Sequence, residues 1–235
     1  MQDTKTIVAA IILAAGSGKR MGGAVPKQLI EIAGKPVLQY TLEKFQACRD
    51  IDLIYVVLPP VLAGKYSRII ATDWGIKKLA KVVEGGAERH TSVLAGLQEL
   101  DDRVDIAMIH DGVRPFVSMR ILQDSIKAAQ DHGAVVVGLS PKDTVKRIAG
   151  NFVRETIDRD QLLLAQTPQT FRKELIIEAN QRASRENFFS TDDVALVERM
   201  GHEVVVVQGD WRNIKITSPE DLVIAKAFLQ EEQCA

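Results

Sequence analysis

The chain has 235 residues, 46% of them hydrophobic, and a formal net charge of −1 at pH 7. This length suits one α/β domain spanning residues 1–235 with a sizeable core. The balanced charge, without a run of Lys and Arg, argues against partners such as nucleic acid or an anionic membrane surface. Two cysteines, Cys48 and Cys234, give little support to a zinc site or a disulfide framework. The N-terminal apolar stretch is too short for a signal peptide or a membrane span, which predicts a cytoplasmic protein.

Apolar, β-branched runs alternate with stretches of helical spacing along the chain. This alternation predicts a doubly wound, mostly parallel, Rossmann-like sheet. The predicted strands are Ile7–Leu13, Leu53–Leu58, Leu79–Val83, Ile106–Ile109, Ala134–Leu139 and Val204–Val207. The predicted helices are Val37–Ala47, Thr91–Leu100, Arg120–Asp131, Lys173–Ala183, Asp192–Met200 and Pro219–Leu229, the last with Ser218 as its cap.

The first predicted strand runs into a loop of small residues that carries cations. Ala14, Ala15, Gly16 and Gly18 allow backbone amides to approach a ligand closely, with Ser17 between the glycines. Lys19, Arg20 and Lys27 supply positive charge. The order of glycines and cations fits neither the Walker phosphate loop nor the dinucleotide fingerprint, so the pattern favours another kind of polyphosphate site. A Gly-rich turn with solvated basic residues is the alternative.

Two other predicted strands are followed by polar groups at the same edge of the sheet. Gly85-Gly86 and Ser92 could receive a flat base, although a simple helix start uses the same residue types. Asp111 could hold Mg²⁺ and Arg114 a phosphate, or the two could form an internal salt bridge.

Residues 141–166 interrupt the alternation of strands and helices. Two alternating strands flank the turn Ala149-Gly150-Asn151 and predict a β-arm inserted into the domain. Because exposed strand edges are often covered by a second copy, we expect this arm to mediate a homodimer.

Taken in order, the motifs resemble the 2-C-methyl-D-erythritol 4-phosphate cytidylyltransferase family over nearly the full chain. The matching segments are Ala14–Met21, Pro26–Gln28, Gly85–Arg89, Ser92–Leu97, His110–Pro115, Asp143–Thr144, Gln166–Gln169, Thr191–Asp193 and Asn213–Leu222. The resemblance implies transfer of CMP from CTP to methylerythritol phosphate, with release of pyrophosphate, in the non-mevalonate route to isoprenoid precursors. It also implies Mg²⁺ or another divalent cation as cofactor.

The resemblance assigns roles residue by residue. Arg20 and Lys27 match the pair that binds the triphosphate and stabilises the transition state. Arg159 and Lys215 match the positions that hold the substrate phosphate for in-line attack, Arg159 coming from the neighbouring subunit's arm. Further residues around that phosphate are Arg114, Thr144 and Thr167. CTP-binding positions are Ala14, Ala15, Gly16, Ser17, Gly18, Gly86, Ser92 and Asp111, and Asp111 also matches the metal ligand.

Two positions depart from the family pattern, and two other functions compete with the one it implies. Ala87 replaces an aspartate common near the nucleotide, and Arg212 stands where some members carry an acidic residue. A ribitol 5-phosphate cytidylyltransferase shares the loop and the nucleotide chemistry. A nucleotide-binding regulator without activity would be favoured if Arg20 or Lys27 were missing, and both are present.

Overall fold

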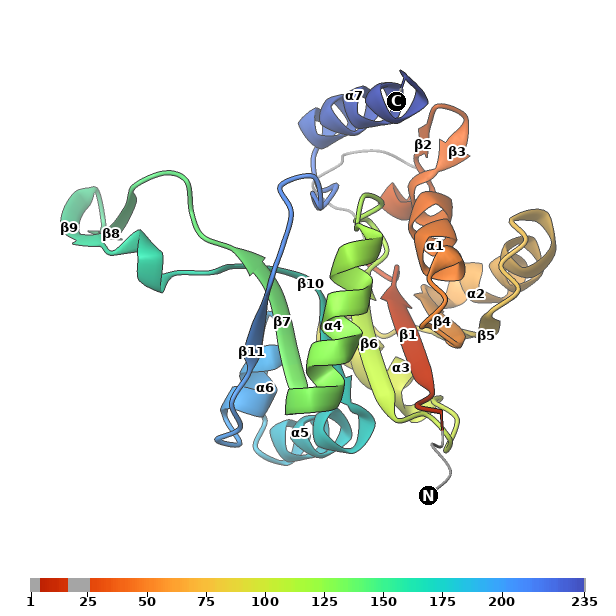
Figure 1. Ribbon diagram of the computed structural model, residues 1–235, viewed down its shortest axis with the longest axis horizontal. Coiled ribbons are helices and arrows are strands. Elements are labelled where there is room, and N and C mark those ends of the chain that lie inside the picture. Colours follow the sequence, from red (N-terminus) through yellow and green to blue (C-terminus); the bar gives the residue numbers. More distant parts are fainter. Residues whose placement is uncertain (1–4, 17–25, 235) are drawn as a thin grey trace.

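The computed structural model describes residues 5–16 and 26–234, and at its centre lies a seven-stranded sheet (Figure 1). The strands follow the order β5-β4-β1-β6-β10-β7-β11. Their bounds are β1 Val8–Leu13, β4 Leu53–Leu58, β5 Leu79–Glu84, β6 Ile106–Asp111, β7 Ala134–Leu139, β10 Leu164–Arg172 and β11 Val205–Gln208. β10 alone runs antiparallel to its neighbours, β6 and β7. The strand order reverses beside β1, which pairs with β4 on one side and with β6 on the other.

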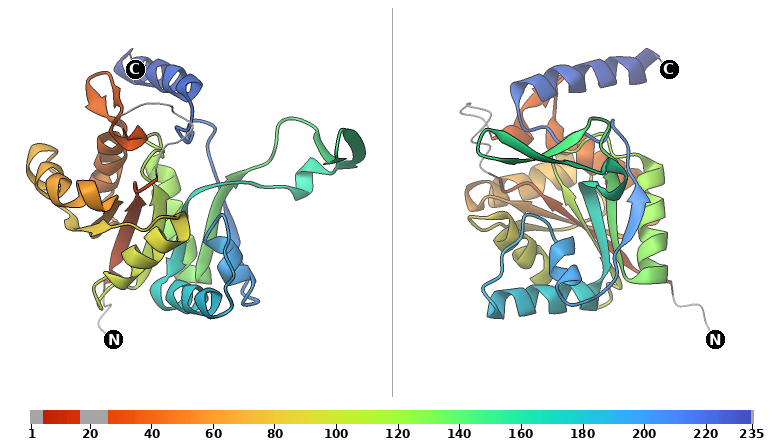
Figure 2. Two further views of the ribbon diagram at one scale, coloured as in Figure 1. Left: turned by 180° about the vertical axis from the view of Figure 1, so that it is seen from behind. Right: turned by 90° about the vertical axis from the view of Figure 1, so that its left-hand side faces the viewer.

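Helices cover both faces of the sheet (Figure 2). One face packs against α1 (Val37–Ala47), α2 (Pro60–Arg68) and α4 (Met119–His132), and the other against α3 (Arg89–Gln98), α5 (Lys173–Arg185) and α6 (Val194–Glu198). Alternate residues of β1 serve the two cores: Ala10 and Ile12 face α1, whereas Ala9 and Ile11 face α3. The predicted doubly wound, mostly parallel sheet is therefore confirmed.

β10 is the strand of the central sheet that the sequence pattern does not predict. Its segment Gln166-Thr167-Pro168-Gln169 is polar and contains a proline, which is typical of a loop. In the structure, the pairing of β10 with β7 shifts register between Gln166 and Gln169, and Pro168 lies in this irregular part. Thr167 and Gln169 are buried. Polar side chains thus enter the interior beside the end of β6.

The last helix, α7 (Pro219–Cys234), lies outside the two layers and closes one end of the molecule (Figure 1). It packs against the small hairpin formed by β2 (Glu31–Ile32) and β3 (Lys35–Pro36). A third apolar cluster joins Ala225 and Leu229 of α7 to Ile32, Val113 and Ile216. The cluster fixes the segment just before α7, which carries Lys215.

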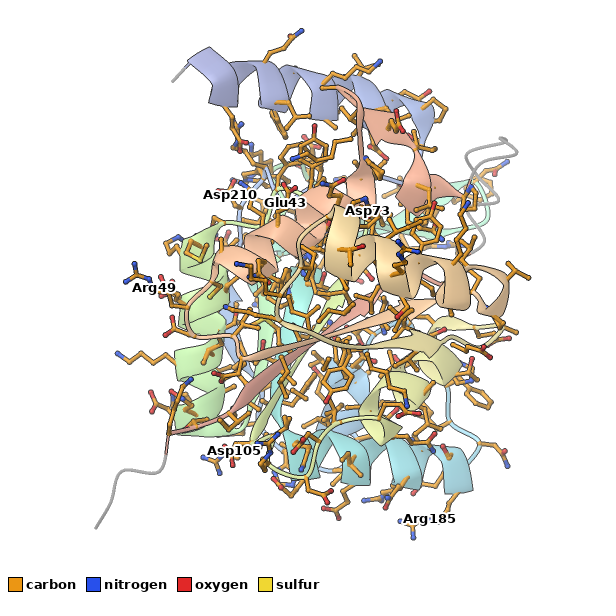
Figure 3. The ribbon with its side chains drawn as sticks, turned by 90° about the vertical axis from the view of Figure 1, so that its right-hand side faces the viewer. Glu43, Arg49, Asp73, Asp105, Arg185 and Asp210 are labelled. Atoms are coloured by element: carbon orange, nitrogen blue, oxygen red, sulfur yellow. The ribbon has the colours of Figure 1, made fainter. Side chains whose placement is uncertain are left out.

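Charged side chains such as Arg49, Asp105 and Arg185 extend outward from the sheet and helix layers (Figure 3). Among the described residues, no helix combines the length and the apolar character that crossing a membrane requires.

The inserted arm projects away from the sheet (Figure 1). It contains β8 (Val145–Ala149) and β9 (Phe152–Ile157), which form a separate two-stranded sheet, followed by the 3-10 turn Arg159–Gln161. Gly150 has a φ of 59° and lies in the predicted turn. The arm ends earlier than the sequence suggests, because Leu164 already pairs with Leu139 of β7. Phe152, Ile148 and Val153 on the hairpin are all largely exposed.

Candidate active site

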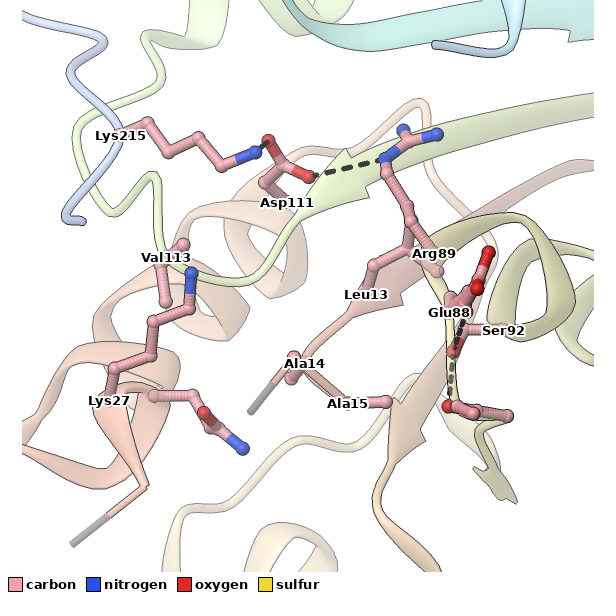
Figure 4. Close-up of a pocket in the computed structure, with 14 residues that line it drawn as sticks. Leu13, Ala14, Ala15, Lys27, Glu88, Arg89, Ser92, Asp111, Val113 and Lys215 are labelled. Carbon is pink, nitrogen blue, oxygen red and sulfur yellow. Dashed lines mark hydrogen bonds and ion pairs between the residues drawn. The ribbon is translucent and has the colours of Figure 1, made fainter. Parts of the chain in front are cut away.

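A pocket opens at the carboxyl ends of β1, β5 and β6, where the strand order reverses (Figure 4). Ligands of open α/β sheets bind at such a reversal, because the loops on its two sides diverge and leave a crevice. The lining residues are Leu13, Ala14, Ala15, Gly16, Lys27, Gln28, Gly86, Ala87, Glu88, Arg89, Ser92, Asp111, Val113 and Lys215. The pocket therefore brings together segments that are distant in the sequence.

The loop after β1 forms one wall of the pocket. The amide of Ala14 still donates to Val57 O at 2.8 Å, and beyond it the chain continues through Ala15 to Gly16 at the rim. The predicted residues Ser17, Gly18 and Arg20 lie outside the described residues.

The next described residue after Gly16 is Pro26, and it precedes a 3-10 turn over Lys27–Leu29. Lys27 lines the pocket, as does Gln28. Gln28 is only 1% exposed, and within the described part of the chain neither polar atom of its amide has a hydrogen-bond partner. Because a buried amide without partners is costly, a polar ligand is the natural complement to this wall. Gln28 is not among the predicted site residues, since only burial distinguishes it from a surface glutamine.

The loop between β5 and α3 forms the opposite wall. A Cβ at Gly85 would lie 2.5 Å from Ala15 Cβ, so glycine is needed there for the two loops to pack closely. Gly86 and Ser92, two of the predicted site residues, line the pocket. The Ser92 hydroxyl donates to Glu88 O at 3.1 Å and thereby supports the start of α3.

Asp111, at the end of β6, is the buried carboxylate at the centre of the site. Lys215 Nζ lies 2.9 Å and Arg114 Nε 3.4 Å from its Oδ2, and Arg89 Nε lies 3.9 Å from its Oδ1. Burial acts to raise the pKa of Asp111, but Lys215, Arg89 and Arg114 outweigh it and hold the pKa well below its usual range. Asp111 is therefore a charged carboxylate at any ordinary pH.

Arg114 forms the internal salt bridge that the sequence analysis considered as an alternative. Besides Asp111, it contacts the loop before α7, since its Nη1 donates to Asn213 O at 2.7 Å. Asn213 in turn donates to Thr167 O at 2.9 Å. Burial lowers the pKa of Arg114 from its ordinary value. Arg114 thus ties the loop carrying Lys215 to the end of β6, just behind the pocket wall.

Thr167 and His110 form a buried hydrogen-bond chain behind Asp111. The backbone amide of Asp111 donates to Thr167 Oγ1 at 3.1 Å, and Thr167 Oγ1 lies 3.1 Å from His110 Nδ1. His110 Nε2 lies 3.2 Å from Arg114 O. Since the carbonyl can only accept, Nε2 carries the imidazole proton and Nδ1 accepts from the threonine. The Thr167 hydroxyl therefore helps to position Asp111.

Thr144 and Arg159 lie on the arm and do not line this pocket. Both are exposed, and Arg159 Nη1 donates to Lys142 O at 2.7 Å. The resemblance expects Arg159 to serve the neighbouring subunit, and its place on the projecting arm agrees with a position away from its own pocket.

Arg89 is a pocket residue that lies in the matching segment Gly85–Arg89 but is not among the predicted site residues. Its Nη2 lies 2.7 Å from Oδ2 of the buried Asp193. Burial acts to lower the pKa of Arg89, and Asp193 and Asp111 reverse this effect, so that the pKa is raised. Its position just after the glycine pair at the end of a strand indicates that Arg89 lies near the pocket. No local sequence pattern indicates that Asp193 and Asp111 are its partners.

The two residues that depart from the family pattern, Ala87 and Arg212, differ in whether they line the pocket. Ala87 lines the pocket and adds no polar group to it. Arg212 Nη1 pairs with Glu231 at 2.6 Å, and its guanidinium lies 4.3 Å from the centre of the Phe228 ring. Arg212 therefore fastens α7 to the loop before it.

Comparisons with known proteins agree over nearly the whole chain. The family model described as 2-C-methyl-D-erythritol 4-phosphate cytidylyltransferase matches residues 8–231. A protein of that name from Geotalea uraniireducens is 44% identical over 225 residues, which cover 95% of this chain and 97% of the relative. Another, from Geobacillus thermodenitrificans, is 44% identical over 220 residues, covering 94% of this chain and 96% of the relative.

Solved structures lead to the same family. The 4-diphosphocytidyl-2C-methyl-D-erythritol synthase from Anaerococcus prevotii has a TM-score of 0.83 and 36% identity, covering 96% of this chain and 97% of the other. The 2-C-methyl-D-erythritol 4-phosphate cytidylyltransferase from Thermus thermophilus has a TM-score of 0.78 and 32% identity, covering 94% and 98%. Together with the site at the strand reversal, these matches show that the chain belongs to the 2-C-methyl-D-erythritol 4-phosphate cytidylyltransferase family.

Proposed function

We propose that the protein transfers CMP from CTP to 2-C-methyl-D-erythritol 4-phosphate in the non-mevalonate route to isoprenoid precursors. An oxygen of the substrate phosphate attacks the α-phosphorus of CTP, the bond to the β-phosphate breaks, and pyrophosphate leaves. The observation that carries this proposal is the pocket at the strand reversal, which combines small residues with Lys27, Lys215 and Asp111 in a chain of this family.

The nucleotide occupies the part of the pocket lined by small residues. Ala14, Ala15, Gly16 and Gly86 leave room for a flat base and a ribose between the two loops, and Ser92 supports that wall. The buried amide of Gln28, which has no hydrogen-bond partner among the described residues, supports a ligand with both donors and acceptors. Ser17 and Gly18, which follow Gly16 in the sequence, are further proposed CTP-binding residues.

Lys27 and Arg20 stabilise the charge that gathers on the α-phosphate in the transition state. Fixed cations aimed at such developing charge supply a large share of catalysis in phosphoryl-type transfers, because the reaction needs positioning and charge more than a general base. Lys27 lines the pocket, and Arg20 follows the pocket residue Gly16 by four positions in the sequence.

Asp111 is the proposed ligand for Mg²⁺. Among the described residues, no group of three or more His, Cys, Asp or Glu side chains is arranged to hold a metal. A single carboxylate fits Mg²⁺ nevertheless, since this ion commonly binds one or two carboxylates together with substrate phosphates and water. The lowered pKa of Asp111 keeps that carboxylate charged. When bound, the ion would offset the negative charge of the triphosphate.

The substrate phosphate is held by Lys215 from the same chain and by Arg159 from the arm of a second copy. Arg114 and Thr167 place Lys215 and Asp111 around it, and Thr144 lies at the base of the arm. The exposed apolar side chains of the hairpin support dimerisation through the arm. We further propose that each chain is a single cytoplasmic catalytic domain with the arm as its insertion.

The test is pyrophosphate release from CTP and Mg²⁺ with methylerythritol 4-phosphate, ribitol 5-phosphate or no acceptor. We expect turnover with the first alone. Lys27→Ala should lower kcat by a factor of about 10²–10³, whereas Lys127→Ala, at an exposed position on α4, should leave it unchanged. Preference for ribitol 5-phosphate, or no pyrophosphate with either acceptor, would refute the proposed function.

A further inference from the structure

Arg89 joins two buried carboxylates that come from different parts of the fold. It is the first residue of α3, and its guanidinium lies between Asp193 (2.7 Å) and Asp111 (3.9 Å). A cation in the first turn of a helix opposes the helix dipole, so the stability of α3 does not explain an arginine here. An arginine at this position is explained by the contacts of its side chain with Asp193 and Asp111.

The Asp193 side chain accepts a hydrogen bond from Arg89 and does not cap its own helix, α6. It occupies the N-cap position of α6, where an aspartate usually accepts a bond from the first turn, yet within the described chain its side chain makes no such bond. The neighbouring Asp192 accepts from the Ala195 amide instead, at 3.2 Å. The backbone amide of Asp193 is held by Gln169 Oε1 of β10 at 2.9 Å. The backbone of Asp193 is thus held by β10, and its carboxylate contacts Arg89.

The two oxygens of Asp111 have different surroundings. Lys215 and Arg114 both contact Oδ2, whereas Arg89 approaches Oδ1 only to 3.9 Å, beyond hydrogen-bond length. An unrestrained arginine beside a carboxylate tends to form a short, often bidentate pair. The short bond of Arg89 is instead the one from Nη2 to Asp193 Oδ2, at 2.7 Å.

We infer that Asp193 is a positioning residue that holds Arg89 back from Asp111 and thereby keeps Asp111 Oδ1 available to a divalent cation. Arg89 then adds positive charge to the pocket without occupying the metal's ligand. This inference rests on the proposed metal role of Asp111, so the experiment includes a variant that tests that role separately.

The experiment measures Mn²⁺ binding by electron paramagnetic resonance in the presence of CTP and without acceptor, so that no turnover occurs. Asp193→Asn frees Arg89 to pair with Asp111 and should weaken Mn²⁺ binding at least tenfold. Asp193→Ser, which removes the same charge with a smaller side chain, should do the same. The double variant Arg89→Met/Asp193→Asn leaves nothing to block Oδ1 and should return to within about threefold of the unmodified protein. Asp192→Asn, the matched loss of a neighbouring charge, should bind Mn²⁺ normally.

A purely structural role predicts the opposite order, with the double variant at least as impaired as the single ones. That order, or unchanged Mn²⁺ binding in both Asp193 variants, would overturn the inference. Asp111→Asn separates the metal role of Asp111 from the positioning role of Asp193. Weak binding in Asp111→Asn together with normal binding in the Asp193 variants would refute only the positioning role. Normal binding in Asp111→Asn would refute the metal role and the inference with it.

Discussion

At the scale of single residues, His110 shows how burial fixes a protonation state behind the active site. Its ring lies 4.9 Å from that of Phe45, and its two nitrogens face Thr167 and the carbonyl of Arg114. Burial lowers its pKa to about 4. The imidazole is therefore neutral near pH 7 and can hold Thr167 in the orientation that supports Asp111.

This lowered pKa predicts a loss of stability in mild acid. The unfolded chain takes up the proton near pH 6.5, whereas the folded protein resists it until about pH 4. The stabilisation that neutral His110 provides is thus fully present above pH 6.5 and is lost as pH falls toward 4. Between pH 7.5 and 4.5, this loss should lower the free energy of unfolding by about 2–3 kcal/mol. The pKa of Asp111 is also lowered, and it costs stability in the same direction, but only as pH falls below the ordinary aspartate value.

Urea denaturation at pH 7.5, 6.0 and 4.5 measures this effect. His110→Gln should be less stable than the unmodified protein at pH 7.5 but should lose less free energy of unfolding on acidification. Equal losses in the two proteins would show that the buried histidine does not resist protonation.

The residues of the site differ in how far the sequence predicts them. Asp111 and Lys215 were expected from strand-end and motif positions, and the structure brings them to 2.9 Å. Asp193 lies 104 positions from Arg89, and Asn213 lies 99 positions from Arg114. Such partners depend on which loops the fold places side by side, and nothing in the local pattern indicates them.

At the scale of elements, two helices contain a glycine in opposite surroundings. Gly64 in α2 has open space where a Cβ would be, since within the described structure no heavy atom beyond the local backbone and the two neighbouring residues lies within 4 Å of that position. A Cβ at Gly96 in α3 would lie 2.6 Å from Ile11 Cγ2 and 3.2 Å from Val57 Cγ2. α3 therefore packs on the sheet through its glycine.

Alanine at these two positions should have effects of opposite sign. Gly64→Ala should raise the free energy of unfolding by about 0.5–1 kcal/mol, because alanine favours the helix. Gly96→Ala gains the same propensity but should lower stability by about 1–3 kcal/mol through overpacking against β1. Chemical denaturation of both variants measures the difference. Stabilisation by Gly96→Ala would mean that α3 can move away from the sheet at little cost.

The elements that the sequence predicted share a strong pattern. β4, β7 and α1 have the predicted bounds because each is continuous, apolar and clearly delimited. α2 was missed because Ala63 is its one buried residue, so no apolar periodicity marks it. β10 was missed because its polar, proline-containing centre becomes strand only through pairing with β6 and β7. The missed strand carries Thr167 and Gln169, and both help to build the site.

At the scale of the whole molecule, the pocket and the arm are separate parts of one chain. The pocket gathers Lys27, Asp111 and Lys215, whereas Arg159 is exposed on an arm that projects from the sheet (Figure 1). Phe152 on the same arm is 70% exposed. Burying such side chains against a second copy would both stabilise a dimer and bring each Arg159 toward the other pocket.

A mixed dimer tests this arrangement directly. Arg20→Ala disables the pocket of its own subunit, and Arg159→Ala disables the pocket that its arm serves. If the arm acts on the partner, the mixed dimer has one pocket with both groups intact and one with neither. Random pairing of equal amounts should then restore about a quarter of the unmodified activity, although each variant alone is inactive.

Co-expression with two affinity tags isolates the mixed dimer, and sedimentation checks that its mass is twice the 25.9 kDa of one chain. Pairing Arg20→Ala with the double variant Arg20→Ala/Arg159→Ala supplies the control, because no pocket there has both groups. An inactive mixed dimer of the two single variants would assign Arg159 to its own subunit, and a monomer in sedimentation would remove the basis for exchange altogether.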